Sequence, residues 1–203
     1  MKNVNRIGIF GGTFDPVHIG HLRTALHIFE EFQLDQVRFI PAGIPPNKIS
    51  KQITDSKLRL EMLRSAVVPW KDQFFIDDIE IRRSGSSYMI ETVSELKNNF
   101  PESDFFLLLG NDNVADLPNW KDWKKLIEEV HIISFKKDST VYPLPYTMNE
   151  FENRILISNA PLIEVSSTEI RNRILLKKNV DLLVAENVLG IIQSKKLYQN
   201  MPS

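Results

Sequence analysis

Apolar residues along the chain fall into short continuous runs that alternate with stretches of helical spacing. Short runs are typical of strands buried on both faces of a parallel sheet, and spaced positions are typical of amphipathic helices. The runs predict strands at 6–12, 36–41, 74–81, 104–110, 131–135 and 154–158. The spacing predicts helices at 19–32, 55–67, 88–100, 166–178 and 185–198, with a loop and a helix within 111–130. Residues 136–153, which prolines interrupt, are predicted to be irregular.

This alternation predicts an α/β fold: a Rossmann-like, doubly wound parallel sheet with helices on both faces and a helical C-terminus. No internal repeat or linker divides the chain, so residues 1–203 are expected to form one domain. In such sheets, ligands bind beyond the carboxyl ends of the strands, near the point where the strand order reverses. A binding site is therefore expected at that edge.

The composition narrows the possible partners. The net charge of −1 gives no overall attraction to nucleic acid or to an anionic membrane. The absence of cysteine excludes disulfides and thiolate metal sites. The longest apolar run, at 105–109, is far shorter than the ~20 residues that cross a bilayer. We therefore expect a cytoplasmic protein with no nucleic-acid or membrane partner, and the composition leaves its oligomeric state open.

The segment GGTFDPVHIGH, residues 11–21, follows the first predicted strand and leads into a helix. Its glycines allow the backbone to approach a ligand closely, and free N–H groups at a helix start favour anions. His18 and His21 are three residues apart, which places them on one face of the helix start, and Gly20 leaves that face open. The segment, called here the histidine segment, therefore predicts a nucleotide or phosphate site.

Two different interpretations of the histidine segment remain open. The histidines are incidental in the first, although two imidazoles beside three glycines at a strand end favour a ligand. The second is a zinc site, which needs a third ligand. His27 points in a different direction from the helix, and His131 is remote in sequence.

A second segment, VSSTEIR at 165–171, begins a later helix. Ser166 and Glu169 fit a capping box, and the aliphatic residues that flank them fit a hydrophobic staple. Hydroxyls at a helix start, with an arginine one turn later, suit the β- and γ-phosphates of a triphosphate. The residues that capping does not explain are Ser167, Thr168 and Arg171.

The histidine segment resembles the (H/T)-x-G-H signature of the nucleotidyltransferase superfamily, which pairs it with a serine–arginine segment of this kind. Further segments resemble the bacterial nicotinate-nucleotide adenylyltransferase family in the same order along nearly the whole chain, least from 137 to 153. They are PAGIPPNK, RRSGSSYMIETV, LLLGNDNVADLPNWKDWKKL and LVAENVLGIIQSKKLY. The S-Y-x-x-x-T and L-P-x-W patterns mark this family within the superfamily.

The resemblance implies adenylyl transfer from ATP to nicotinate mononucleotide, which gives deamido-NAD and pyrophosphate in NAD biosynthesis. The acceptor phosphate is already anionic, so it would attack in line without a general base or a covalent intermediate. Catalysis would then depend on alignment and charge stabilisation. Mg²⁺ would be carried mainly by the ATP phosphates, with no metal site in the protein itself.

The resemblance also implies roles for particular residues. His18, His21 and Arg171 would be catalytic, with His21 stabilising the α-phosphoryl group. Ring stacking on Trp120 and contacts from Tyr88 and Thr92 would bind the acceptor, although Trp120 also fits ordinary core packing. The ATP-binding residues would be Gly11, Gly12, Thr13, Phe14, His18, Gly20, His21, Lys48, Gly110, Asp112, Ser167, Thr168 and Arg171.

Some features fit more than one interpretation. Asp112, expected at a ribose hydroxyl, also fits an N-cap. The family commonly has a histidine where this chain has Asn47, so a phosphate contact there falls to Lys48. HIGH and KISKQ are similar to the two signatures of class I aminoacyl-tRNA synthetases, but no room remains for an anticodon-binding domain. One rival function is a phosphopantetheine adenylyltransferase, which lacks the pairing of L-P-x-W with S-S-T-x-I-R seen here. Another is a catalytically silent nucleotide-binding module, against which the intact His18, His21 and Arg171 argue.

Overall fold

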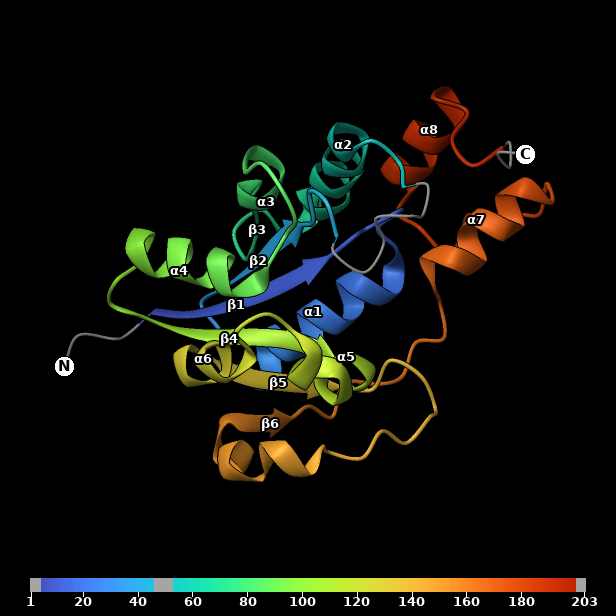
Figure 1. The fold of residues 1–203 in the computed structure, drawn as a ribbon. Coiled ribbons are helices and arrows are strands. Elements are labelled where there is room, and N and C mark those ends of the chain that lie inside the picture. Colours follow the sequence, from blue (N-terminus) through green and yellow to red (C-terminus); the bar gives the residue numbers. More distant parts are fainter. Residues whose placement is uncertain (1–4, 46–52, 200–203) are drawn as a thin grey trace.

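The structure, a computed structural model, describes residues 5–45 and 53–199. Its centre is a six-stranded sheet in which every strand pairs in parallel with its neighbours (Figure 1). The strands are β1 (Asn5–Gly12), β2 (Gln36–Pro41), β3 (Phe74–Ile76), β4 (Ser103–Gly110), β5 (His131–Phe135) and β6 (Ile155–Ile157).

The strand order is β3-β2-β1-β4-β5-β6. The chain therefore runs outward from β1 to β3, then returns to the middle of the sheet and continues outward from β4 to β6. Ile7 of β1 aligns with Gln36 of β2 on one side and with Phe105 of β4 on the other. The order reverses between β1 and β4, as a doubly wound sheet requires. This confirms the predicted Rossmann-like fold.

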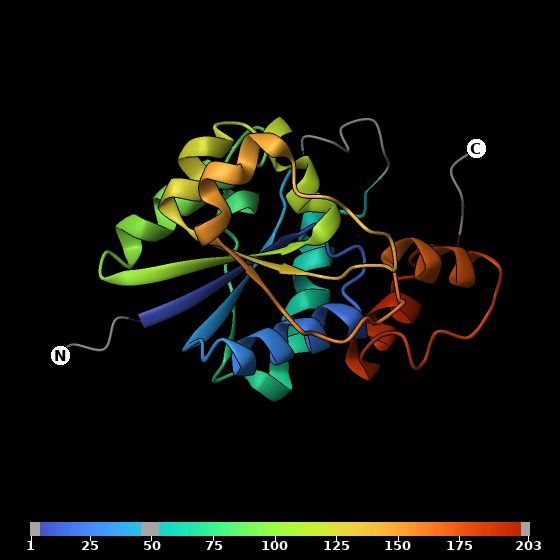
Figure 2. The same ribbon diagram turned by 90° about the horizontal axis from the view of Figure 1, so that it is seen from below.

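Helices cover both faces of the sheet in two layers (Figure 2). One layer comprises α1 (Ile19–Glu31), α2 (Ser56–Val67), α7 (Ser167–Leu175) and α8 (Glu186–Ser194). The other comprises α3 (Ile79–Arg82), α4 (Met89–Asn99), α5 (Asn111–Asp116) and α6 (Trp123–Glu129). Alternate residues of β4 enter opposite cores: Phe106 lies in the first, and Leu107 lies in the second. Burial on both faces explains why the strand sequences are continuously apolar.

Local signals fix several helix ends. Gln33 adopts a left-handed φ of 48°, and the Leu34 N–H donates to the Phe29 carbonyl at 3.0 Å, which closes α1 with a Schellman motif. The Asp55 side chain accepts the N–H of Lys57 at 2.9 Å and caps α2. No helix of the described residues is both long and apolar enough to cross a membrane.

Three predictions of local structure were wrong. The segment 111–130, expected to be a loop followed by one helix, contains α5, the 3₁₀ helix η3 (Leu117–Asn119) and α6. The strand expected at 74–81 ends at Ile76, and 79–82 form the single turn of α3. Asp77 accepts the N–H of Ile79 at 3.3 Å, and Arg82 bonds Asp78 at 2.6 Å one turn earlier, so local carboxylates favour the turn. The segment expected to be irregular contains a 3₁₀ helix, η4 (Tyr146–Arg154), because fully buried Met148 anchors it to the core.

Candidate active site

A cleft of about 890 Å³ lies at the carboxyl ends of β1 and β4, where the strand order reverses. It has the size and position of a ligand site in an open α/β sheet. Segments far apart in the sequence form its walls: the histidine segment, the start of α4, the turn after η3 (Leu117–Asn119), and the start of α7. The predicted site residues that line it are Gly11, Gly12, Thr13, Phe14, His18, Gly20, His21, Tyr88, Gly110, Trp120, Ser167, Thr168 and Arg171.

The two histidines lie against each other at the start of α1. Their ring centroids are 3.6 Å apart and their planes differ by 31°. The Nδ1 atom of His21 accepts the backbone N–H of His18 at 3.2 Å. A nitrogen that accepts carries no proton, so the neutral His21 ring holds its proton on Nε2. That N–H is a suitable donor for a phosphate oxygen.

His18 is the N-cap residue of α1 and is only 7% exposed. Burial lowers its pKa from 6.5 to about 4, so its ring is neutral at pH 7. Its Nδ1 is buried and has no hydrogen-bond partner among the described residues. A neutral His18 ring avoids the repulsion that two charged imidazoles at this separation would suffer.

Phe14 sets the shape of the histidine segment between the glycines and α1. It is buried and has a left-handed φ of 48°, a costly conformation for a bulky residue. Its ring meets the His21 ring edge-on, with centroids 5.0 Å apart. A Cβ at position 12 would lie 2.9 Å from the Phe14 ring, so Gly12 leaves the space that this ring occupies.

Helix α7 is bonded directly to the histidine segment. Ser167 donates its hydroxyl to the Pro16 carbonyl at 2.8 Å, and Arg171 donates Nη1 to the Asp15 carbonyl at 2.7 Å. Arg171 also donates Nη2 to the Thr168 hydroxyl at 3.2 Å. Ser166 caps the helix as predicted, accepting the Glu169 N–H at 3.1 Å. The start of α7 and the histidine pair thus face one cleft.

Tyr88 and Trp120, which are predicted to bind the acceptor, line the same cleft from the start of α4 and the end of η3. Trp120 donates its indole N–H to Asp116 at 3.3 Å, which fixes the ring, and it also packs against the second core. Its position is thus compatible with both acceptor stacking and core packing. Lys121 lies beside them, with Nζ 4.5 Å from the centre of the Tyr88 ring and 2.8 Å from a Glu91 oxygen.

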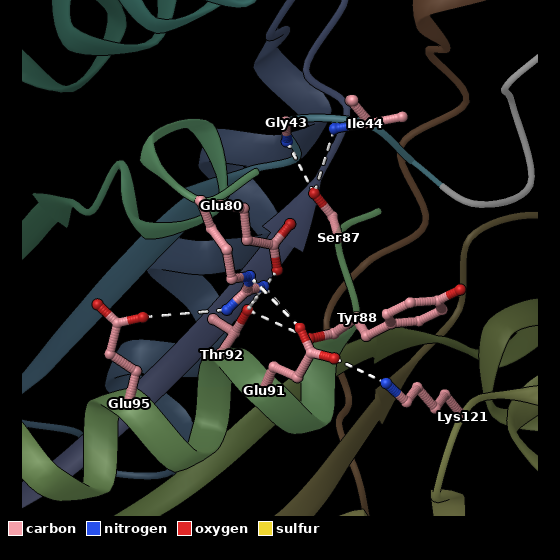
Figure 3. Close-up of polar contacts among 10 residues, drawn as sticks. Gly43, Ile44, Glu80, Ser87, Tyr88, Glu91, Thr92, Glu95 and Lys121 are labelled. Atoms are coloured by element: carbon pink, nitrogen blue, oxygen red, sulfur yellow. Dashed lines mark hydrogen bonds and ion pairs between the residues drawn. The ribbon is translucent and has the colours of Figure 1, made fainter. Parts of the chain in front are cut away.

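Two predicted residues are placed differently, and a third lies outside the described residues. Thr92 is fully buried, and its hydroxyl donates to Glu80 at 2.7 Å rather than lining the cleft (Figure 3). Asp112 also lies outside the lining and pairs with Lys137; it is not the N-cap of α5, which is Gly110. Lys48, like Asn47, lies outside the described residues, so its predicted role stays a prediction.

Sequence reasoning missed several residues that support the cleft. Arg59 is 1% exposed and donates to the carbonyls of Thr13 and Ala42, both at 2.7 Å, which ties the histidine segment to the loop after β2. An arginine on an apolar helix face was the available signal. Glu80 lines the cleft without a motif of its own, and Ser87, the first residue of the S-Y-x-x-x-T pattern, lines it without having been predicted as a site residue. Within the described residues, no three His, Cys, Asp or Glu side chains are grouped so as to hold a metal ion.

Comparison with known proteins gives consistent results. A Cytidylyltransferase-like family model matches residues 9–173. A probable nicotinate-nucleotide adenylyltransferase of Exiguobacterium sibiricum is 39% identical over 95% of this chain and 98% of its own length. The nicotinate-nucleotide adenylyltransferase of Bacillus subtilis is 36% identical over 97% of this chain and 100% of its own length.

The fold also matches a solved structure. Plasmodium falciparum nicotinic acid mononucleotide adenylyltransferase complexed with NaAD aligns with a TM-score of 0.79, over 96% of this chain and 97% of that chain. Its sequence identity of 19% supports the likeness of fold alone.

Proposed function

The chain belongs to the Cytidylyltransferase-like family and, within it, to the nicotinate-nucleotide adenylyltransferases, and on that premise we propose that it transfers the adenylyl group of ATP to nicotinate mononucleotide. The products would be deamido-NAD and pyrophosphate, in a step of NAD biosynthesis. The observation that carries the proposal is one cleft lined by His18, His21 and the start of α7 on one side and by Tyr88 and Trp120 on the other.

In the proposed reaction, a phosphate oxygen of the acceptor attacks the α-phosphorus of ATP in line, and pyrophosphate leaves from the opposite side. No general base is needed, because the nucleophile is already anionic, and no covalent intermediate forms. The barrier is lowered by alignment and by donors directed at the developing charge. His21 is the donor for the α-phosphoryl oxygens, since its Nδ1 accepts from the backbone and its Nε2 holds the proton.

Arg171 and the hydroxyls of Ser167 and Thr168 are proposed to bind the leaving pyrophosphate. A helix start with an arginine one turn later suits such an anion. In the structure, Ser167 and Arg171 donate hydrogen bonds to carbonyls of the histidine segment, and Arg171 donates another to Thr168, which holds these groups at the cleft. Mg²⁺ is proposed to enter bound to the ATP phosphates, as part of the substrate.

The acceptor side is proposed to select a carboxylate over a carboxamide. Backbone N–H groups around the start of α4 would satisfy both oxygens of nicotinate. The amide of nicotinamide would turn an N–H₂ group toward a donor, which loses one hydrogen bond and its charge assistance. Sites that match a polar group in this way discriminate by orders of magnitude.

The test is an acceptor screen with ATP and Mg²⁺ in which pyrophosphate release is measured. We expect kcat/KM for nicotinate mononucleotide to exceed that for nicotinamide mononucleotide by roughly 10²-fold or more. Phosphopantetheine serves as the control acceptor and should be inactive. Comparable kcat/KM for the two mononucleotides would refute the specificity, and activity with phosphopantetheine alone would refute the proposed function.

A further inference from the structure

A buried polar network lies behind the acceptor side of the cleft (Figure 3). Its centre is Glu80 of α3, which is 4% exposed although it carries a carboxylate. The hydroxyl of fully buried Thr92 donates to Glu80 Oε1 at 2.7 Å and accepts from Arg83 Nη2 at 3.0 Å. Arg83 also contacts Glu91 at 3.5 Å and Glu95 at 3.9 Å.

Ser87 connects this network to the loop after β2. Its hydroxyl oxygen accepts the backbone N–H groups of Gly43 at 3.0 Å and Ile44 at 3.3 Å. The backbone N–H of Ser87 donates in return to the Ile44 carbonyl at 2.9 Å. The fit is close, since a Cβ at Gly43 would lie 2.2 Å from the Glu80 carbonyl oxygen. The loop after β2, α3 and the start of α4 therefore form one packed unit.

The hydrogen-bond directions require an acceptor at position 80. The Thr92 hydroxyl accepts from Arg83. Its oxygen lies closer to Glu80 Oε1, at 2.7 Å, than to the Tyr88 carbonyl, at 3.4 Å, so its proton is directed toward Glu80. The Ser87 hydroxyl accepts from two backbone amides and directs its proton toward the Glu80 carboxylate. Burial raises the pKa of Glu80, and the hydrogen bonds from the Thr92 and Ser87 hydroxyls act against that rise. A glutamine of the same shape accepts only one of these protons, and its N–H₂ group would face the other hydroxyl.

We infer that Glu80 is a positioning residue for acceptor specificity: it holds residues 87–92 so that the backbone at the start of α4 matches a carboxylate of the acceptor. The inference rests on the proposed function. Glu80 acts through Ser87 and Thr92, because these side chains flank Tyr88 and the first turn of α4 in sequence. Recognition of both carboxylate oxygens depends on the spacing of the backbone donors. A less firmly held segment 87–92 should therefore lower selectivity between the two mononucleotides more than it weakens ATP binding.

The test compares Glu80→Gln with Glu95→Gln in the full chain. Glu95 contacts the same Arg83 but is 43% exposed, so Glu95→Gln makes the same chemical change at the solvent edge of the network. In Glu80→Gln, we expect KM for nicotinate mononucleotide to rise about tenfold, the effect of one charge-assisted hydrogen bond. The nicotinate-to-nicotinamide ratio of kcat/KM should fall by a similar factor, with KM for ATP changed by less than about twofold; Glu95→Gln should leave all three unchanged.

The outcomes separate this inference from the proposed function. A selective unmodified enzyme whose folded Glu80→Gln variant keeps the same ratio overturns the inference alone. An equal rise in KM for ATP and for the acceptor overturns it too, because that indicates general loosening. If Glu80→Gln does not fold, the same kinetic comparison is made with Ser87→Ala. This substitution removes the hydroxyl that joins the network to the loop after β2, at a less buried position. An unmodified protein inactive on nicotinate mononucleotide overturns both.

Discussion

The two sides of the cleft are built in different ways. On the proposed phosphate side, the groups come from one continuous segment, residues 11–21, and one helix start, and α7 donates hydrogen bonds to main-chain carbonyls of that segment. On the acceptor side, the wall depends on side-chain contacts among α3, α4 and the loop after β2. The proposed nucleotide side thus comes largely from local sequence, whereas the proposed acceptor side depends on a buried network assembled from several elements.

The largest effect is expected from a substitution that removes a binding group on the proposed phosphate side only. His21→Ala should lower kcat roughly 10²- to 10³-fold, because it removes a preorganised donor at the α-phosphoryl group. The ratio of kcat/KM for the two mononucleotides should stay unchanged, since His21 lies on the phosphate side of the cleft. Steady-state kinetics with both acceptors measure this.

The matched control is His27→Ala, which changes another histidine of the same helix. The His27 side chain is 36% exposed, and its Nε2 lies 3.6 Å from an oxygen of Glu31, one turn later in the helix. His27 does not line the cleft, whereas His21 does. The variant should turn over normally. Near-normal kcat in a folded His21→Ala protein would end the proposed role of His21.

Acidification should change the free energy of unfolding in opposite directions at His18, on one side of the cleft, and at Glu80, on the other. His18 binds its proton near pH 6.5 when unfolded but only near pH 4 when folded. Between these values the unfolded state binds more protons, so acidification from pH 6.5 to 4 lowers the free energy of unfolding by about 3 kcal/mol at this group. Burial raises the pKa of Glu80 instead, so at that group acidification favours the folded state.

Measuring Tm from pH 7 to pH 4 tests whether acidification destabilises the fold through His18 and stabilises it through Glu80. His18→Gln should make the acid decline shallower than in the unmodified protein, and Glu80→Gln should make it steeper. Parallel Tm curves for the unmodified protein and His18→Gln would contradict the assignment of a buried, neutral His18.

The smallest expected effect concerns Trp120 on the acceptor side. Trp120→Ala should raise KM for both mononucleotides by roughly tenfold, the loss of a stacked aromatic contact. Their ratio should stay the same, because stacking senses the ring face rather than its substituent. This result is to be compared with that of Glu80→Gln, which should change the ratio of kcat/KM for the two mononucleotides. A Trp120→Ala variant that changes the ratio as much as Glu80→Gln would remove the distinction between binding and positioning on this side.

The histidine segment and the serine–arginine segment could be found from sequence because their signals are local. A glycine turn, two histidines on one helix face and a Ser166 cap each depend on residues within about one or two helical turns. The same reasoning failed at 77–82, where Asp77 and Asp78 turn the chain into α3, because the apolar pattern alone continues as a strand. It also placed Thr92 at the acceptor, whereas its hydroxyl bonds a carboxylate that no pattern indicated.

The sequence by itself determined the alternation of strands and helices, the starts of α1, α2 and α7, and the position of the histidine segment after β1. Periodicity, capping and glycine turns specify these features over a few residues. Only the tertiary structure decided the long-range contacts. Ser167 and Arg171 donate hydrogen bonds to the carbonyls of Pro16 and Asp15, and Glu80 lies beneath residues 87–92. These contacts exist because the strand order reverses between β1 and β4, which brings the ends of distant strands to one edge and buries the side chains between them.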